Sequence, residues 1–319
     1  ALGYDDIILR GNSFGSQWSF SYLRTYPEHV ARAVLGGIEP IDFGYDRPAH
    51  VWRAMQRIGE RAAADPRLAE HLDDQSLDEI IVGILEKLDN EPVTVEVKLP
   101  DGLGPVPVVL NGDDLRASLM RFANDYYMRS GLARWPRFIL EMQQGDFRYL
   151  GLLRVQARQS RTLPLIYLTI DNSLGISPAR EKVLRADPAR EILGEINATY
   201  YWTRDMMPVE EVDNAFRQEV EIDTPVLMIQ GDLDMNTPVE NAEHAIEFMQ
   251  NGHLLRVNGG THLAIYEAMQ FEPVVRQALL EFLRDGKLEA MPDSIELESP
   301  EFETPDAGSS LYQRALEGF

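Results

Sequence analysis

The feature that most constrains the fold of this chain is the sequence Gly-Asn-Ser-Phe-Gly at positions 11–15. It follows a short apolar and β-branched run at 7–9 and precedes a segment at 16–24 whose apolar residues fit a buried helix. A serine between two glycines in a strand–turn–helix context is held on a sharp bend above the edge of a sheet. This context makes Ser13 a candidate nucleophile, and the alternative is that its side chain only caps the following helix.

The segments around this turn predict an α/β fold. Tyr26-Pro27 stops the first helix, because proline lacks a backbone donor and disfavours helix before it, and a second buried strand follows at 30–38. Strand, helix and strand in this order form a βαβ unit with a parallel sheet. The same rhythm resumes at residue 224, where two further buried strands alternate with helices up to residue 286.

Between these two parts the pattern changes to helical apolar spacing, interrupted at 93–114 by an alternating, Gly- and Pro-rich stretch that predicts a hairpin or an extended excursion. We expect residues 1–45 and 218–286 to form the core, and residues 46–217 to form a mainly helical cap or lid insertion. The remaining segment, 287–319, is acidic and punctuated by proline. We expect it to be a tail on the surface rather than part of the core.

Composition limits the chemistry that the chain can perform. Its 319 residues carry 52 acidic against 30 basic side chains, a net charge of -22, which argues against nucleic-acid and anionic membrane partners. The chain has no cysteine, so thiolate nucleophiles, disulfides and cysteine-based metal centres are excluded. The sequence shows neither a metal-binding histidine motif nor a Gly-rich phosphate loop after a strand. We therefore expect no cofactor and no metal, and the compartment stays open.

A serine nucleophile needs a general base, and histidine serves best because its pKa lies near working pH. Of the six histidines, His262 stands apart because it directly follows a predicted strand, in a Gly-Gly loop. Catalytic groups of an open α/β sheet gather at that edge. The other histidines lie in helical patterns, beside the helix-stopping proline or at the start of a strand: His29, His50, His71, His244 and His253.

The base in turn needs a carboxylate to orient it. Asp232 and Asp234 both follow the strand at 224–231, and Asp234 lies deeper in the loop, from where it can reach the histidine-bearing loop. Asp232 is better placed to accept hydrogen bonds from its own turn. We therefore expect Asp234 to orient His262. The backbone N–H of Phe14, the residue after the candidate nucleophile, would be one donor of an oxyanion hole.

Three segments resemble a known family. Residues 2–40, "LGYDDIILRGNSFGSQWSFSYLRTYPEHVARAVLGGIEP", are similar to the elbow region of α/β-hydrolase serine exopeptidases, the proline iminopeptidases and tripeptidyl aminopeptidase-like proteins. "TPVLMIQGDLDMNTPVENA" at 224–242 resembles their acid loop, and "GGTHLAI" at 259–265 resembles their base loop. The resemblance puts the family's aspartate on Asp234 and its histidine on His262.

The resemblance covers residues 1–45 and about 220–285, and it implies an α/β-hydrolase fold with Ser13, Asp234 and His262 as a catalytic triad. It implies a serine hydrolase that cleaves peptide or amide bonds and releases N-terminal residues from a peptide or small amide substrate. Esterases share these motifs, so a carboxylesterase or other ester or amide hydrolase is an alternative. An inactive fragment or binding protein on the same fold is another.

The resemblance also implies that carboxylates of the cap hold the free N-terminus of the substrate, although no single residue is singled out for this role. The candidates are Glu141, Asp146, Glu195, Asp205, Glu210 and Glu211. The chain departs from the family in two respects. It has no cysteine, and the strands and oxyanion loop that precede the family's elbow have no counterpart in the sequence. We therefore expect a fragment whose missing N-terminal strands belong to a full-length chain, or a separate chain that supplies them.

Overall fold

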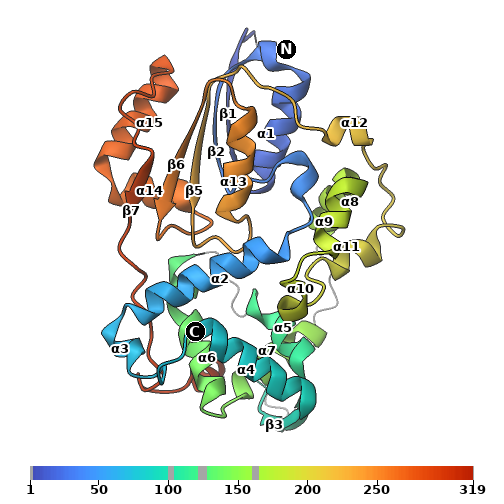
Figure 1. Cartoon of the computed structure of the whole chain (residues 1–319), viewed down its shortest axis with the longest axis vertical. Coiled ribbons are helices and arrows are strands. Elements are labelled where there is room, and N and C mark those ends of the chain that lie inside the picture. Colours follow the sequence, from blue (N-terminus) through green and yellow to red (C-terminus); the bar gives the residue numbers. More distant parts are fainter. Residues whose placement is uncertain (1–2, 100–103, 121–127, 160–164, 319) are drawn as a thin grey trace. The chain divides into compact units, whose positions relative to one another are not determined.

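The computed structural model describes residues 3–99, 104–120, 128–159 and 165–318 (Figure 1). The chain divides into two compact units, each built from segments that lie far apart in the sequence. The first unit comprises residues 1–54, 165–187 and 197–298. The second unit comprises residues 55–164, 188–196 and 299–319.

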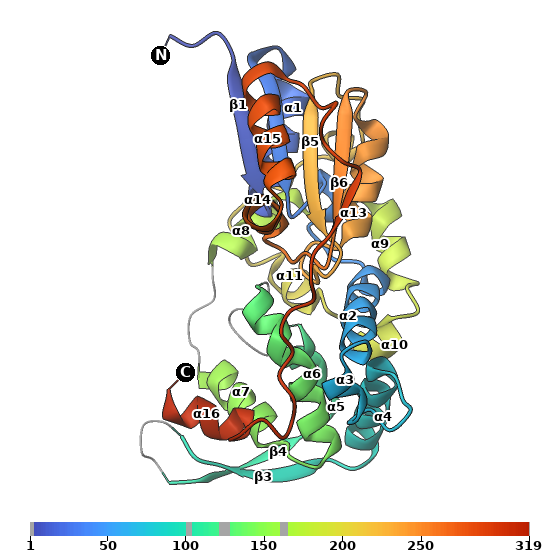
Figure 2. The ribbon, with the colours of Figure 1, turned by 90° about the vertical axis from the view of Figure 1, so that its left-hand side faces the viewer.

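A five-stranded sheet forms the centre of the first unit (Figures 1 and 2). Its order is β1-β2-β5-β6-β7, and all neighbouring strands are parallel. Every residue of β5 is buried, as expected for a strand in a sheet that helices cover on both faces. β1 lies at one edge of the described sheet, where Ile7 and Ile8 are exposed. The strands are β1 (Ile7–Asn12), β2 (Val30–Gly36), β5 (Val226–Gly231), β6 (Gly252–Asn258) and β7 (Ser294–Glu296).

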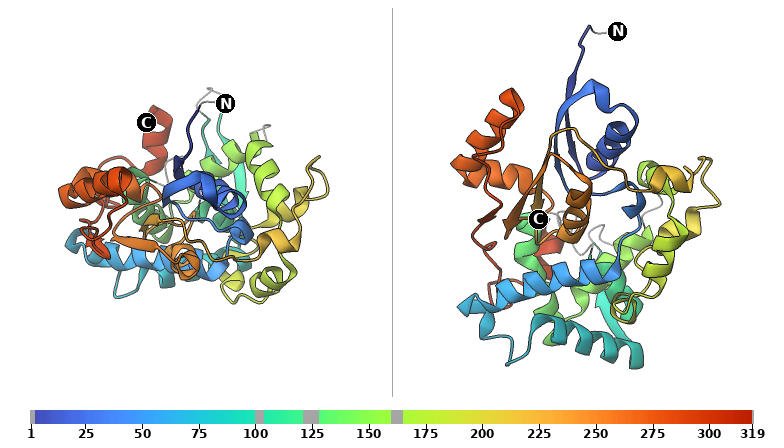
Figure 3. Two further views of the ribbon diagram at one scale, coloured as in Figure 1. Left: turned by 90° about the horizontal axis from the view of Figure 1, so that it is seen from above. Right: turned by 45° about the horizontal axis from the view of Figure 1, so that its top comes forward.

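Helices cover both faces of this sheet (Figure 3). Successive side chains of a strand point to opposite faces, so Met228 packs in one core and Ile229 in the other. On the Met228 side lie α1 (Phe14–Thr25) and α13 (Val239–Ala245), which contribute residues such as Phe20. On the Ile229 side lie α14 (Ala264–Phe271) and α15 (Pro273–Asp285), which contribute residues such as Phe282.

Several short helices of the first unit come from the segment predicted as a cap. A small core of Tyr45, Ile176 and Leu184, with Tyr200 and Tyr201 against it, ties them to the loop after β2. Because of this packing, the units divide the chain differently from the predicted domains. The remaining elements of the first unit are η1 (Pro27–His29), η2 (Ile41–Phe43), α8 (Leu165–Leu174), α9 (Pro178–Arg185), α11 (Ala198–Thr203), α12 (Asn214–Arg217) and η3 (Ile246–Phe248).

The second unit is mainly helical. The alternating stretch predicted as a hairpin forms one, with Val93 opposite Leu110 in an antiparallel pair. α4 begins with a capping box between Ser76 and Glu79, a strong signal for a helix start. The elements of this unit are α3 (Pro66–Ala69), α4 (Leu77–Asn90), β3 (Val93–Val97), β4 (Val106–Leu110), α5 (Gly112–Leu119), α6 (Arg129–Gln143), α7 (Arg148–Gln159), α10 (Arg190–Leu193), α16 (Leu311–Glu317) and most of α2 (Pro48–Ala63).

The segment 287–319 is not a surface tail, and the prediction that it lies outside the core is wrong. Its first part adds β7 to the sheet beside β6, and Leu297 is buried in the core of the first unit. Its last part belongs to the second unit, where Tyr312 of α16 is buried and the buried Arg137 donates to the carbonyl oxygen of Ser309 at 2.7 Å. The anchoring residues are single apolar side chains in an acidic stretch, so no periodic pattern reveals them.

Candidate active site

Ser13 alone makes the turn from β1 to α1, since the strand ends at Asn12 and the helix begins at Phe14. Its backbone has φ 58° and ψ -128°, a positive φ that non-glycine residues rarely adopt. The surrounding structure holds this strained turn, and the Ser13 N–H donates to the carbonyl oxygen of Gly36 at 3.0 Å. Within the described helix the Ser13 side chain makes no capping hydrogen bond, which disfavours the capping alternative.

The two glycines of the motif differ in what they do. A Cβ on Gly11 would overlap the carbonyl oxygen of Gly15, because the first turn of the helix packs directly on the end of the strand. A Cβ on Gly15 would meet none of the described atoms within 4 Å. The close approach of strand and helix therefore requires only the first glycine.

His262 and Asp234 form a buried pair at the carboxyl ends of their strands. Asp234 lies in the loop after β5, and His262 lies in the loop between β6 and α14. His262 Nδ1 lies 2.8 Å from Asp234 Oδ2, the geometry of an N–H that donates to a carboxylate. Both side chains are almost completely buried. The structure thus brings together the histidine and the aspartate that the sequence singles out.

Asp234 accepts hydrogen bonds at both carboxylate oxygens. Oδ1 accepts from the backbone N–H groups of Asn236 at 2.8 Å and Thr237 at 3.0 Å. Oδ2 accepts from the Thr237 hydroxyl at 2.6 Å and from Gln230 Nε2 at 3.0 Å, in addition to His262. Burial alone would raise the pKa of Asp234, but the charge and hydrogen bond of His262 and the Thr237 donors lower it.

The same pairing acts on His262 in the opposite sense. Burial lowers the pKa of an imidazole, but the charge of Asp234 and its hydrogen bond outweigh burial. The pKa of His262 is therefore raised above its ordinary value of 6.5. The charge of Asp46 acts in the same direction.

Gly37 connects this pair to the turn at Ser13. Gly37 has φ +52°, and a Cβ there would lie 2.8 Å from both His262 Cε1 and the Ser13 backbone nitrogen. The imidazole and the turn therefore flank the same glycine. Asn12 Nδ2 also donates to the carbonyl oxygen of His262 at 3.4 Å. Phe14 begins α1, so its N–H is one of the groups at a helix start that have no partner within the helix.

Asp232 differs from its predicted role. Its Oδ1 accepts from the backbone N–H of Gly259 at 2.7 Å, in the loop that carries His262, rather than only from its own turn. In the same loop, Glu267 of α14 accepts from the Thr261 N–H at 2.7 Å and from the Thr261 hydroxyl at 2.6 Å. These two carboxylates hold the loop at Gly259 and Thr261, directly before His262.

A second group of buried polar side chains near Ser13 is absent from the sequence-based predictions. Gln17, one helical turn after Ser13, is 1% exposed, and neither amide atom has a hydrogen-bond partner among the described residues. Asp171 of α8 is 7% exposed. A Cβ on Gly44 would lie 3.1 Å from Asp171 Oδ1 and 3.4 Å from Gln17 Nε2, so both side chains point to the same side of that glycine.

Glu39, which is half-buried, is the second carboxylate of this group. Its backbone N–H donates to Ser16 Oγ at 3.0 Å, which fixes it beside the first turn of α1. Burial raises its pKa well above the ordinary value, and the charges of Asp171, Asp46 and Asp234 raise it further. Burial likewise raises the pKa of Asp171 to about 7, against a hydrogen bond from Tyr200 that lowers it.

The sequence contains a weak signal for one of these two acids. Glu39 follows β2 at the edge of the sheet where functional residues gather, so its position could have drawn attention to it. Asp171 lies inside an apolar helical run, and nothing in the pattern sets it apart.

Most of the carboxylates suggested for a substrate N-terminus are engaged in ion pairs within their own unit. The pairs are Glu141 with Arg137, Asp146 with Arg148, Glu195 with Arg190, and Glu211 with Arg204 and Arg217. These carboxylates already have cationic partners. A substrate ammonium group would have to compete with a guanidinium at each of them.

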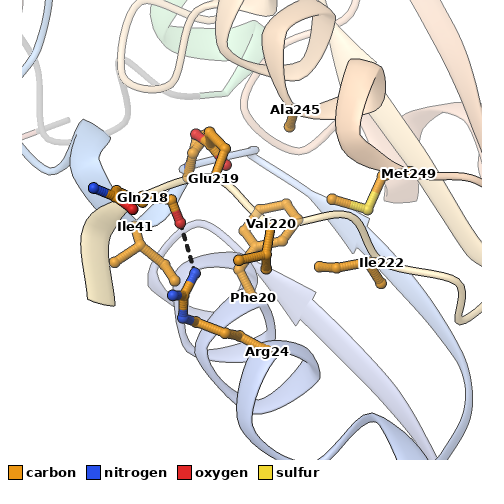
Figure 4. A pocket seen from close by; sticks show the side chains of 10 residues that line it. Phe20, Arg24, Ile41, Gln218, Glu219, Val220, Ile222, Ala245 and Met249 are labelled. Atoms are coloured by element: carbon orange, nitrogen blue, oxygen red, sulfur yellow. Dashed lines mark hydrogen bonds between the residues drawn. The ribbon is translucent and has the colours of Figure 1, made fainter. Parts of the chain in front are cut away.

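The pocket in Figure 4 is lined by none of the residues of the candidate active site. Its walls include Phe20 and Arg24 of α1 and Met249 after η3, and Arg24 Nη1 donates to the carbonyl oxygen of Gln218 at 2.6 Å. Its volume of about 20 Å³ has room for roughly one water molecule. It is therefore a packing defect rather than a substrate site.

In residues 3–99, 104–120, 128–159 and 165–318, no group of three or more histidines and carboxylates is arranged to hold a metal ion. No helix in that part of the chain has both the length and the apolar character needed to cross a membrane.

Comparison with known proteins identifies one family model, described as TAP-like protein, which matches residues 194–295. The match includes β5, β6 and the loops of Asp234 and His262. No curated protein matches the chain significantly.

Three solved structures illustrate the likeness in three dimensions. The serine hydrolase CCSP0084 from Cycloclasticus zankles is 12% identical, with 89% of this chain and 66% of that chain covered and a TM-score of 0.35. MGS-M2, an α/β hydrolase from a deep-sea metagenome, is 13% identical, with 91% and 70% covered and a TM-score of 0.31. An α/β hydrolase fold protein from Nakamurella multipartita is 14% identical, with 90% and 72% covered and a TM-score of 0.34.

The chain thus spans about two thirds of the length of these solved proteins. Its own architecture is a parallel sheet covered by helices, with a strained serine turn at the end of one strand. Together with the family match, this shows the fold class predicted from the sequence. The chain has the α/β-hydrolase fold, and its residues 194–295 are similar to TAP-like proteins.

Proposed function

We propose that this chain is a serine hydrolase that cleaves peptide or amide bonds and acts as an aminopeptidase, releasing N-terminal residues. The observation that carries the proposal is the strained turn at Ser13 beside the buried pair of His262 and Asp234. A nucleophile at an elbow, a base with a raised pKa and an ionised acid are the parts that acyl transfer needs.

In the proposed mechanism Ser13 Oγ attacks the substrate carbonyl carbon while its proton passes to His262 Nε2. The backbone N–H of Phe14 donates to the oxyanion that forms. His262 then returns the proton to the leaving nitrogen as the C–N bond breaks, which leaves an acyl ester on Ser13. A water molecule then attacks the acyl ester, with His262 again taking the proton and returning it to Ser13 Oγ, and the carboxylic acid product is released. Asp234 stays ionised throughout and stabilises the imidazolium.

The aminopeptidase part of the proposal draws support from the acids beside the elbow. A substrate ammonium near Glu39 and Asp171 would offset the cost of ionising buried carboxyl groups. The carbonyl oxygen of the Gln17 amide, which lacks a partner among the described residues, is an acceptor for the same ammonium. The similarity of residues 194–295 to TAP-like proteins is consistent with this reading.

A substrate panel tests the proposal. Aminoacyl arylamides with a free N-terminus, the same compounds N-acetylated, and short acyl esters are compared by kcat/KM. We expect the free arylamides to exceed the acetylated ones at least roughly tenfold, as a paired charge near the reacting bond requires. Hydrolysis of esters alone would favour a carboxylesterase. The Ser13→Ala variant is expected to lose both turnover and labelling by a serine-directed phosphonate, and full activity in it would reject Ser13 as the nucleophile.

A further inference from the structure

Gln230 is a polar residue in an otherwise apolar central strand. It lies in β5 with no exposed surface, between the buried Ile229 and Gly231. An amide in such a place costs free energy unless both of its ends are hydrogen-bonded. The hydrogen-bond partners of the Gln230 amide therefore indicate why a polar side chain occupies this position.

Both ends of the Gln230 amide are satisfied. Oε1 accepts from the backbone N–H of Ile38 at 2.8 Å, in the loop after β2. Nε2 donates to the carbonyl oxygen of Thr237 at 2.7 Å and to Asp234 Oδ2 at 3.0 Å, in the loop after β5. One side chain thus joins two loops that belong to neighbouring strands.

Both loops contact residues of the candidate site. Ile38 is adjacent to Gly37, which flanks both Ser13 and His262. Asp234 Oδ2 is the oxygen that His262 Nδ1 approaches, and the Thr237 hydroxyl lies only 3.1 Å from the same nitrogen. Without the Gln230 donor, Asp234 Oδ2 would keep only the Thr237 hydroxyl and His262 as partners, and the Thr237 hydroxyl would compete with the carboxylate for His262 Nδ1.

We propose that Gln230 is a positioning residue that fixes Asp234 Oδ2 relative to the loop at Gly37, so that His262 is held between its acid partner and Ser13. The inference rests on the proposed roles of Ser13, Asp234 and His262. It adds to them a fourth side chain, which is proposed to act through Asp234 and the backbones of Ile38 and Thr237 rather than by contact with the substrate.

Two substitutions separate positioning from packing. Gln230→Met keeps the volume and removes every hydrogen bond of the side chain. Gln230→Glu keeps the acceptor for Ile38 and, when protonated, a donor for Asp234. Once ionised, it places a second negative charge about 3 Å from that carboxylate.

We expect Gln230→Met to lower kcat roughly 10–100-fold with KM changed less than about threefold, because substrate contacts remain while the base is misaligned. The ratio of kcat between Gln230→Glu and the wild type should approach one at acid pH and fall as pH rises. A purely structural role predicts equal, pH-independent ratios for both variants, and that result would overturn the proposal.

A readout independent of turnover separates this proposal from the proposed function. The downfield proton resonance of His262 Nδ1–H and the titration of its ring are followed by NMR in the folded wild type and both variants. Broadening or loss of the resonance in Gln230→Met supports the proposal, and an unchanged resonance and titration in both variants overturn it. Absence of hydrolysis by the wild type would reject the function, while the NMR result still decides the role of Gln230.

Asn172→Leu is the matched control for loss of a buried amide. Asn172 is 2% exposed and donates to the carbonyl oxygen of Leu168 at 2.7 Å and to Thr203 Oγ1 at 3.0 Å. We expect it to lower stability without altering the His262 resonance. If it alters that resonance as much as Gln230→Met does, the effect is a general loss of packing and the proposal fails.

Discussion

Two regions beside Ser13 contain buried carboxyl groups, and the pKa values of these groups are shifted in opposite directions. Asp234 is 1% exposed and Asp171 is 7% exposed, so burial differs little between them. Asp234 accepts hydrogen bonds from two backbone groups and three side chains, and its pKa is lowered. Asp171 receives a hydrogen bond from Tyr200, and its pKa rises to about 7. The charge of His262 and the hydrogen-bond donors, rather than the depth of burial, therefore set the difference in pKa between the two acids.

The two charge states suit two tasks. An acid that stays ionised can orient a histidine and stabilise it when it becomes protonated. Acids whose pKa is raised by burial ionise more readily when a cation arrives, because the cation offsets their desolvation.

Asp234→Asn removes the ionised acid, and we expect kcat to fall about 10⁴-fold with KM little changed, because an amide favours the wrong tautomer of His262. Steady-state hydrolysis of a free aminoacyl arylamide measures the loss. Asp232→Asn is the control, since Asp232 accepts from Gly259 rather than from His262, and it should cost less than roughly tenfold. Equal losses in the two variants would remove the distinction between the acids.

Asp171→Asn should make the protein more stable at neutral pH. The pKa of Asp171 is about 7 in the folded protein, against an ordinary value of 3.8, so between these pH values the folded state binds a proton that the unfolded state lacks. Its contribution to the free energy of unfolding therefore falls as pH rises through this range.

Asp171→Asn does not show this fall in the free energy of unfolding. At pH 8 its free energy of unfolding should exceed that of the wild type by up to roughly 4 kcal/mol, and the difference should shrink towards pH 4. Urea denaturation at several pH values measures it. Parallel stability curves for the variant and the wild type would show that Asp171 is not neutral in the folded protein.

The same substitution should weaken recognition of a free N-terminus. We expect Asp171→Asn to raise KM for free aminoacyl arylamides roughly tenfold and to leave the N-acetylated compounds within about twofold, because only the former carry the cation. Glu211→Gln is a control, since Arg204 and Arg217 already pair with that carboxylate. A similar change in KM for both substrate classes would contradict an ammonium site at Asp171.

The pH dependence of kcat/KM tests the effect of the ionised Asp234 on the pKa of His262, and the expected change is the smallest of those described. The rate should rise with pH as His262 loses its proton, with a midpoint above 6.5, since the pKa of His262 is raised. Asp234→Asn should move this midpoint down by about one unit, because it removes the charge that raises the pKa. A midpoint that does not move would mean that Asp234 exerts no field on the base.

Sequence patterns predict the α/β layers and single out the residues at the strand ends. Ser13, Asp234 and His262 each follow a predicted strand, and the carboxyl ends of parallel strands meet at one edge. The position of Glu39 after a predicted strand is a weak signal, but the raised pKa values of Glu39 and Asp171 could not be anticipated, because they depend on burial in the folded protein.

The segment 287–319 was mispredicted for a related reason. Leu297 and Tyr312 anchor it individually, and isolated contacts of this kind leave no periodic trace in the sequence. Local patterns therefore reveal strands, helices and turn chemistry, whereas long-range burial must be seen in three dimensions.

The most direct test of the central claim is mass spectrometry of the protein after reaction with a serine-directed fluorophosphonate. The account predicts a single adduct on the peptide that contains Ser13, formed more slowly in Asp234→Asn. An adduct on another serine, or an unmodified Ser13 in a protein that hydrolyses arylamides, would contradict it.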